Sequence, residues 1–169
     1  MNQSTPSPFW DFSLRTYSRP GVPNSCLTLQ DGSGVDVNVL LFGLFLGQSN
    51  RKLSAADVRT IAQAIEPWRA EIVVNLRAAR RALKDPPPHF EGPLAESLRK
   101  QVKAAELEAE RIQQEMLFVT FGSAAMGVLE NDAGIASASN IKAYEGYLCS
   151  SFEAQAVATL LQAVGQTNG

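Results

Sequence analysis

The chain has 169 residues, of which 45% are hydrophobic, and its 15 basic and 17 acidic side chains give a formal net charge of −2. A chain of this length suits one domain that buries about two-thirds of its unfolded surface and folds without disulfides or metal. The near balance of charge argues against nucleic-acid binding and against attachment to an anionic membrane, because either would need a local basic patch.

The N-terminal residues predict a cytoplasmic chain that begins with a helix. The segment MNQSTPSPFWDF lacks the basic start and apolar stretch of a secretory signal. Ser7 can cap a helix with its oxygen, and Pro8 suits the first helical position because no backbone donor is needed there. A second short helix is predicted from residue 24 to residue 31, before a glycine-rich turn.

Residues 29–38, LQDGSGVDVN, place polar side chains directly before an apolar run. The candidate ligand-binding side chains are Gln30, Asp31, Asp36 and Asn38, which can form a buried polar network or a small site. The alternative is structural: Asp31 closes one helix, and Asp36 favours the positive end of the next helix dipole. On a helix, we expect at most one of Asp36 and Asn38 to join the core side.

Residues 35–47 begin with the alternation of a strand but continue as a long apolar segment. Thirteen residues are too many for a typical strand, and no second strand is visible to pair with them, so we favour a buried helix. The apolar run of eight residues at 39–46 is much shorter than the roughly 20 that a membrane span requires. The segment therefore predicts core and not a membrane anchor.

Residues 54–119 predict two long helices that form an antiparallel hairpin. Ser54 and Asp57 form a capping box, and apolar residues then recur at steps of three or four. Pro67 interrupts this segment, so we expect a kink or two helices meeting at Glu66. The segment DPPPHFEG at 85–92 must be a loop, because three successive prolines forbid a helix.

The hairpin register predicts ion pairs between its two helices. These would join Arg81 to Glu96, Arg69 to Glu108 and Glu66 to Arg111. A second charge pattern is local: Glu106 and Glu110 lie one helical turn apart and repel each other unless a cation bridges them.

Beyond residue 117 the sequence predicts an apolar, central segment at 117–129 and a polar turn at 131–139. One helix then begins at Ser139 or Asn140, and a last one begins at the Ser150 capping box and ends at Gly165. We expect residues 1–6 and 166–169 to fray. The predicted fold is therefore an all-α single domain, residues 1–169, of six or seven helices built on the hairpin.

The sequence indicates no catalytic residue, cofactor or metal. His89 is the only histidine and lies on the proline loop, so a helical metal site and a nucleophile paired with histidine are both disfavoured. Cys26 and Cys149 fit no paired-ligand spacing. These observations favour a protein that is not an enzyme.

Four basic residues precede the proline loop: Arg77, Arg80, Arg81 and Lys84. Cations near a helix C-terminus are stabilising in themselves, and the functional alternative is contact with an anion. A separate hypothesis places Asp31, Asp36 and Asn38 across a pocket from Arg77 and Arg81.

Two sets of residues carry a resemblance to a known family that covers roughly residues 9–117. The N-terminal set comprises Trp10, Tyr17, Val22, Cys26, Leu27, LQD at 29–31, Gly34, DVN at 36–38, Leu40 and Leu41. The middle set comprises Trp68, Arg69, Leu76, Arg77, Arg80, Arg81 and AELEAERI at 105–112. The chain resembles a proteobacterial family catalogued only as a domain of unknown function, although Phe45 stands where that family has a tryptophan. The resemblance implies a small cytoplasmic helical protein and transfers no catalytic residue.

Two functions follow as hypotheses. The first is a non-enzymatic interaction module, in which a helical surface or the small-residue segment at 122–127 binds a protein partner or a second copy. The second is a small-ligand-binding protein or enzyme that uses Gln30, Asp31, Asp36 and Asn38 facing Arg77 and Arg81. An exposed apolar patch would support the first, and a cavity lined by these side chains would support the second.

Overall fold

Helices account for most of the residues that the computed structural model describes, 6–122 and 126–165. In chain order they are α1 (Pro8–Tyr17), α2 (Val22–Ser33), α3 (Val37–Gln48), α4 (Ala55–Trp68), the π-helix η1 (Arg69–Val73), α5 (Val74–Ala82), α6 (Pro93–Leu117), the π-helix η2 (Phe118–Gly122), α7 (Ala133–Leu148) and α8 (Ala154–Gly165). Because α4, η1 and α5 are continuous, as are α6 and η2, the described residues form seven helical rods. The predicted all-α fold class is confirmed. Residues 1–5 and 166–169, where we expected fraying, lie outside the described residues.

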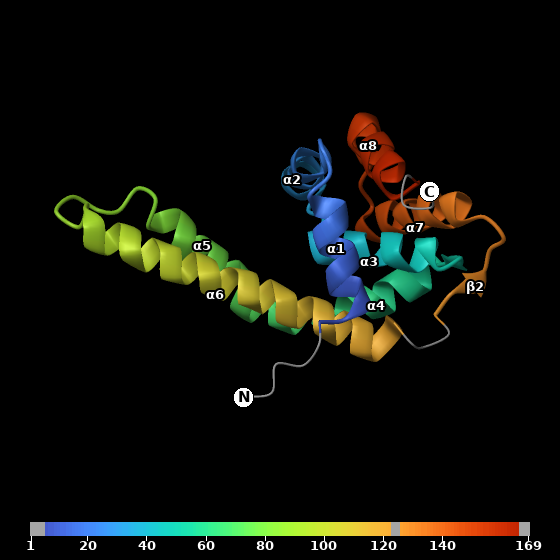
Figure 1. Cartoon of the computed structure of the whole chain (residues 1–169), viewed down its shortest axis with the longest axis horizontal. Coiled ribbons are helices and arrows are strands. Elements are labelled where there is room, and N and C mark those ends of the chain that lie inside the picture. The colour runs from blue at the N-terminus through green and yellow to red at the C-terminus, as the bar shows by residue number, and fades with distance from the viewer. Residues whose placement is uncertain (1–5, 123–125, 166–169) are drawn as a thin grey trace.

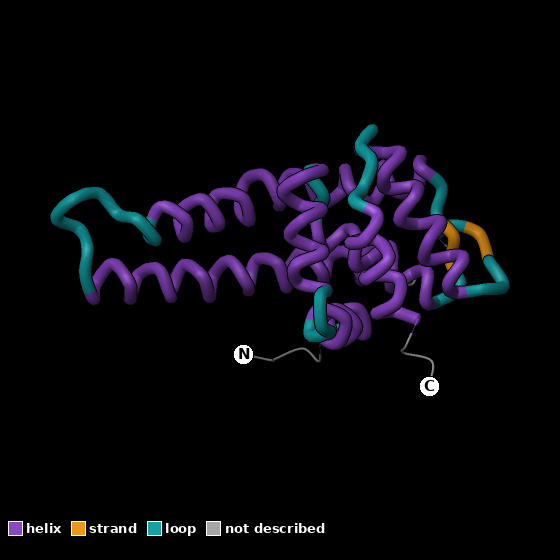
Figure 2. Tube along the Cα trace, turned by 90° about the horizontal axis from the view of Figure 1, so that it is seen from above, coloured by secondary structure: helices purple, strands orange, loops and turns teal. Residues whose placement is uncertain are grey.

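A short pair of strands joins two loops far apart in the chain, which the sequence did not predict. β1 (Arg51–Lys52) pairs antiparallel with β2 (Val128–Leu129), at the end of the molecule opposite the tip of the hairpin (Figure 2). Both residues of β2 are exposed, so the prediction of a central segment at 117–129 is wrong at this end, although Leu117 and Phe121 are buried. Residues 123–125 of the proposed docking segment lie outside the described residues.

The predicted hairpin is present and projects as an arm from the other helices (Figure 1). Pro67 lies inside α4, and the helix continues beyond it without a break at Glu66. The turn that follows is a π-helix, in which the Val74 N–H donates to the Arg69 carbonyl five residues earlier. A proline inside a helix lacks an N–H and crowds the preceding turn. Pro67 therefore lies within a continuous helix, and the helical turn that follows it is wider than an α-helical turn.

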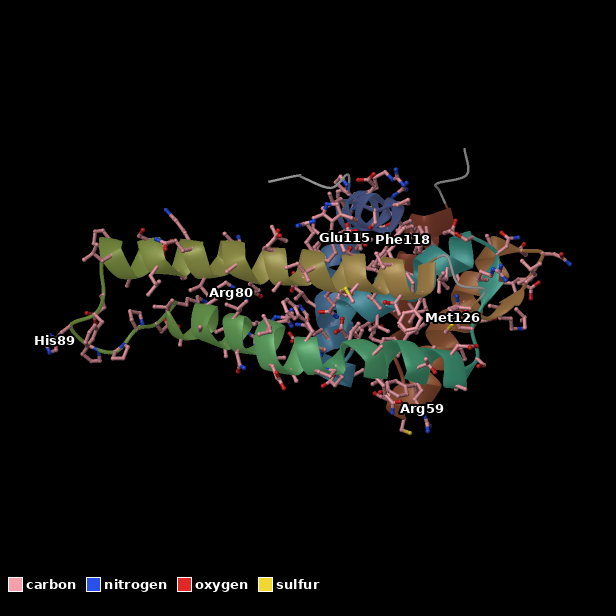
Figure 3. All side chains as sticks on the ribbon, turned by 90° about the horizontal axis from the view of Figure 1, so that it is seen from below. Arg59, Arg80, His89, Glu115, Phe118 and Met126 are labelled. Atoms are coloured by element: carbon pink, nitrogen blue, oxygen red, sulfur yellow. The ribbon has the colours of Figure 1, made fainter. Side chains whose placement is uncertain are left out.

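The three predicted cross-helix ion pairs do not form. Arg69 pairs with Asp36 and Glu66, while Glu96 pairs with Arg99 and Glu108 with Arg111 on α6 itself. The observed pairs across the hairpin join Arg77 and Arg80 to carboxylates further along α6. Side chains on a helix lean toward its N-terminus, so the α5 arginines reach back toward the body of the molecule. Figure 3 shows Arg80 between the two helices and His89 at the far end of the arm.

The core is built around α3, whose residues are buried on nearly every side. This confirms the prediction of a buried helix over a strand. Its main neighbour is α7, which begins at Ala133 because Asp132 caps it by accepting from the Ile135 N–H at 2.9 Å. The predicted turn at 131–139 is therefore wrong: its small residues form a helix that approaches α3 closely. A Cβ added at Gly47 of α3 would lie 2.6 Å from the Cα atom of Ser137.

No helix among the described residues is long and apolar enough to cross a membrane.

Candidate functional site

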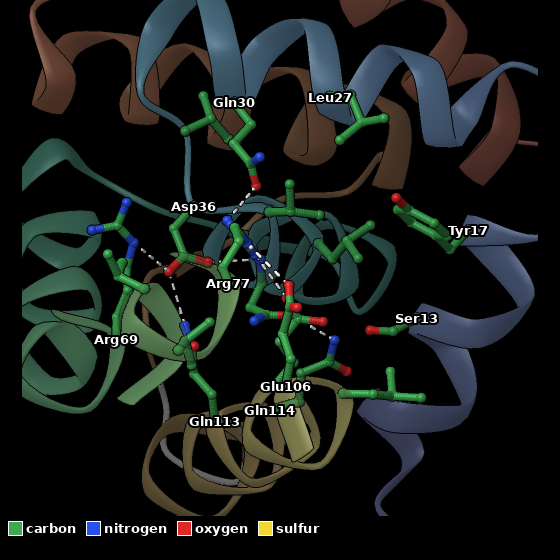
Figure 4. Close-up of a pocket in the computed structure, with 18 of the residues that line it drawn as sticks. Ser13, Tyr17, Leu27, Gln30, Asp36, Arg69, Arg77, Glu106, Gln113 and Gln114 are labelled. Atoms are coloured by element: carbon green, nitrogen blue, oxygen red, sulfur yellow. Dashed lines mark hydrogen bonds and ion pairs between the residues drawn. The ribbon is translucent and has the colours of Figure 1, made fainter. Parts of the chain in front are cut away.

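A cavity of about 320 Å³ lies where the hairpin meets α1 and the connection between α2 and α3 (Figure 4). The predicted site residues Gln30, Asp36, Asn38, Arg77 and Arg81 all line it. Asp31 does not, and its side chain is exposed on α2. The structure thus brings together five of the six candidate residues, and their role in binding stays a prediction.

The turn between α2 and α3 directs two of these side chains into the cavity. Gly34 takes a φ of 69°, in the left-handed region that glycine adopts easily, and ends α2. Asp36 then caps α3 by accepting from the Asn38 N–H at 2.8 Å and the Val39 N–H at 3.3 Å. We expected Asp36 and Asn38 to point to different faces of one helix. Asp36 is instead the N-cap residue, which precedes the first helical residue, and both side chains line the cavity.

The second oxygen of Asp36 is bound by groups that the sequence did not indicate. Its Oδ2 accepts from Gln113 Nε2 at 2.9 Å and lies 3.1 Å from Arg69 Nε. The Asp36 N–H donates to the Tyr144 hydroxyl at 2.9 Å, and burial raises the pKa of Tyr144. Asp36 is therefore a structural cap and a wall of the cavity at once.

Arg77 is the centre of the polar network. Its Nη1 donates to Gln30 Oε1 at 2.9 Å, its Nη2 to Glu110 at 2.8 Å and its Nε to Glu106 at 3.3 Å. Arg80 donates to the same Glu106 carboxylate. Arg77 is thus the cation that bridges Glu106 and Glu110, the two acidic residues that the sequence placed one turn apart.

The two carboxylates have opposite pKa shifts. Burial raises the pKa of Glu106, but the hydrogen bonds from Arg80 and Arg77 outweigh burial and hold it below its usual value. Burial dominates at Glu110, so its pKa is raised despite the contact with Arg77. Glu106 is therefore the carboxylate whose negative charge the fold stabilises.

We expect Glu106→Gln to lower the free energy of unfolding at pH 7 by about 2 kcal/mol, because the partly buried Arg80 loses its carboxylate partner and Arg77 loses one of its two. The lowered pKa means that this contribution is present above the unfolded value and is lost as pH falls through the folded value. The difference in the free energy of unfolding between the wild type and the variant should therefore become smaller as the pH is lowered. Urea denaturation at pH 7 and at lower pH measures both effects.

Glu110→Gln is the matched control, since the raised pKa at this residue gives a contribution that is lost as pH rises. It should cost less than about 1 kcal/mol at pH 7. Two results would contradict the conclusion that the fold stabilises the negative charge of Glu106. One is an equal loss of stability in the two variants, and the other is a loss in Glu106→Gln that is unchanged at low pH.

Three buried polar atoms at this cavity have no hydrogen-bond partner among the described residues. They are Ser13 Oγ, Gln113 Oε1 and Gln114 Oε1, and all three residues line the cavity. The Gln114 amide nitrogen donates to Asn38 Oδ1 at 2.8 Å. In Figure 4, Ser13 of α1 and Gln114 of α6 point toward each other.

Apolar side chains line the outer part of the same cavity. Several of them are exposed to solvent although they are large and hydrophobic: Leu14, Tyr17, Leu27, Val74 and Leu107. They come from α1, α2, α5 and α6. The cavity therefore joins a buried polar interior to an apolar mouth.

The described residues that line the cavity include no histidine or cysteine, and each of their three carboxylates contacts an arginine. Within residues 6–122 and 126–165, no three His, Cys, Asp or Glu side chains gather in a way that could hold a metal ion.

Sequence reasoning named Arg80 only as part of the basic cluster, and it did not assign these other residues to the site: Arg69, Glu106, Glu110, Gln113, Gln114 and Ser13. Only the spacing of Glu106 and Glu110 carried a signal, because it demanded a bridging cation. The two glutamines and Ser13 have no distinctive spacing.

Comparison with known proteins places the chain in a family. A family model described as a protein of unknown function (DUF2390) matches residues 8–117. Every residue that lines the cavity falls within this range, whereas α7 and α8 fall outside it. No curated protein and no solved structure matches the chain.

Proposed function

Because the chain belongs to the DUF2390 family, which has no assigned activity, we propose a function from the cavity itself: binding of a small molecule. The observation that carries the proposal is the group of unpartnered atoms on Ser13, Gln113 and Gln114. A buried polar group without a partner costs about 1 to 3 kcal/mol. A bound molecule that pairs with these atoms would recover part of that cost.

The size and rigidity of the cavity support the same proposal. Ligand pockets commonly enclose about 300 to 1,000 Å³ and combine apolar walls with a few convergent polar groups. Arg77 is held by three acceptors, so its guanidinium is fixed before anything binds. A preorganised site loses little conformational entropy on binding.

Native mass spectrometry of the protein purified from its own cells tests this proposal. We expect the wild-type protein to carry a small molecule that is released on denaturation. Val74→Trp should abolish this excess mass, because Val74 is part of the exposed cavity mouth and an indole there would block it.

Ala78→Trp is the control, since Ala78 is exposed on the same helix and does not line the cavity. It should retain the excess mass. A wild-type protein without any added mass, or equal retention in the two tryptophan variants, would contradict ligand binding at this cavity.

A second candidate function is a non-enzymatic interaction module, which the exposed arm supports. Phe90, Leu94 and Leu98 near its tip are 72%, 88% and 48% exposed, and no residue of α5 is fully buried. Two helices alone cover an apolar seam poorly, and a second hairpin would cover it better.

The occupant that fits this surface is a second copy of the chain. In α6 the exposed Lys100 and Lys103 precede the exposed Glu108, so two antiparallel copies place opposite charges side by side. The same native mass measurement reports this assembly as a doubled mass. A monomer at all concentrations would argue against self-association.

The setting that we propose for either function is the cytoplasm of a proteobacterium, with residues 1–169 acting as one domain. The sequence resemblance supports this setting.

A further inference from the structure

The charges inside the cavity compensate one another. Asp36 pairs with Arg69, Glu110 with Arg77, and Glu106 with Arg80 and Arg77. Arg81 lines the cavity as well, but its side chain is exposed. A charged group of a ligand would lose its hydration inside the cavity. The buried charges that it met there would already be paired.

Two of the three unpartnered atoms require hydrogen-bond donors. Gln113 presents its amide nitrogen to the Asp36 carboxylate, and a carboxylate only accepts, so the free atom of Gln113 is its carbonyl oxygen. Gln114 donates through its nitrogen to Asn38, which leaves its oxygen free in the same way. Ser13 contributes a hydroxyl that can accept or donate.

The mouth requires an apolar body. Leu14, Leu27 and Leu107 are exposed there and come from three different helices. An apolar group that crossed the mouth would remove their surface from water, and each CH₂ that it buried would strengthen binding about fourfold.

We propose that the ligand is an amphipathic molecule with a neutral, hydrogen-bond-donating head, a hydroxyl or a carboxamide, placed among Ser13, Gln113 and Gln114, and an apolar body in the mouth. This inference rests on the proposed small-molecule function and names the chemical class of the ligand. The head supplies the O–H or N–H donors that the buried oxygens lack, and its neutrality suits a cavity whose charges are already paired.

Four six-carbon probes test the inference in two pairs, each with one apolar chain in common: hexan-1-ol with hexylammonium, and hexanamide with hexanoate. Titration is followed by NMR on the side-chain amides of Gln113 and Gln114 in the full-length protein. We expect the alcohol and the amide to shift these signals and to bind at least about tenfold more tightly than either ion. Tighter binding of hexylammonium or hexanoate would overturn the inference.

A serine pair separates the head-group contact from general effects of substitution. Ser13→Ala should weaken hexan-1-ol binding about fivefold, since a hydrogen bond is worth about 1 kcal/mol. Ser25→Ala should leave it unchanged, because Ser25 is buried on α2 and does not line the cavity. Equal affinity in the two variants would remove Ser13 from the site.

The two levels of the proposal can fail separately. If no probe shifts the Gln113 and Gln114 amides and the native protein carries no small molecule, small-molecule binding itself is wrong. If the native protein carries a molecule but the ionic probes bind best, the cavity is a binding site and the neutral head is wrong.

Discussion

Replacing Asn140 with alanine is expected to lower the free energy of unfolding by about 3 kcal/mol, one of the two largest losses that the structure predicts for a single side chain. Asn140 lies on α7 and is only 2% exposed. Its Oδ1 accepts from the Leu53 N–H at 2.6 Å, and its Nδ2 donates to the carbonyls of Gly43 and Arg51, both at 2.8 Å. Alanine would leave these backbone groups without their side-chain partner.

Urea denaturation of the wild type and the variant measures this loss. Asn75→Ala is the control: Asn75 also lies on a helix and is exposed, and its amide donates only to the Glu71 carbonyl one turn earlier. Any gain in helix propensity from alanine is shared by the two variants. If Asn140→Ala cost no more than Asn75→Ala, the side chain would not be what joins α7 to α3 and β1.

Gly47→Ala should be destabilising by about 3 kcal/mol, because α3 and α7 touch at this residue. An added Cβ would lie 2.5 Å from Ser137 Oγ, 2.6 Å from Ser137 Cα and 2.7 Å from Ser137 N. Two of these atoms are backbone, so the helices themselves would have to separate. Overpacking of this kind usually costs about 1 to 3 kcal/mol, and a backbone clash lies at the upper end.

Gly146→Ala gives the opposite expectation on the same pair of helices. No atom lies within 4 Å of a Cβ built at Gly146, so alanine should stabilise α7 by up to about 1 kcal/mol. Thermal or urea denaturation of both variants gives the comparison. A neutral or stabilising Gly47→Ala would show that the helices can part there without loss.

The sequence predicted those elements whose signals are local. The Ser7 cap and Pro8 predicted the start of α1, and the apolar segment at 35–47 predicted a buried helix. α7 was predicted too short, because a run of alanine, glycine and serine at 133–139 is typical of a turn as well as of a close helix crossing. Which of the two occurs depends on the partner helix, and Gly47 is more than 80 residues away.

The site could be predicted only in part, for a related reason. The residues of the α2 to α3 connection are neighbours in the chain, so Gln30, Asp36 and Asn38 could be grouped from the sequence alone. Their partners on α5 and α6 depend on how the hairpin docks and on the direction in which helical side chains lean. That direction brought Glu106 to Arg77, which the predicted loop register did not.

The π-helical turn at Arg69–Val73 leads to an expectation about the length of this helix in related sequences. An α-helix turns by about 100° per residue, and a π turn accommodates one residue more than an α turn. Consider a relative that has one residue fewer between positions 69 and 73. With a regular α-helix at that point, its equivalent of Arg77 would still face the cavity. A relative of equal length must keep the wider turn, so aligned sequences should show a one-residue gap wherever it has been lost.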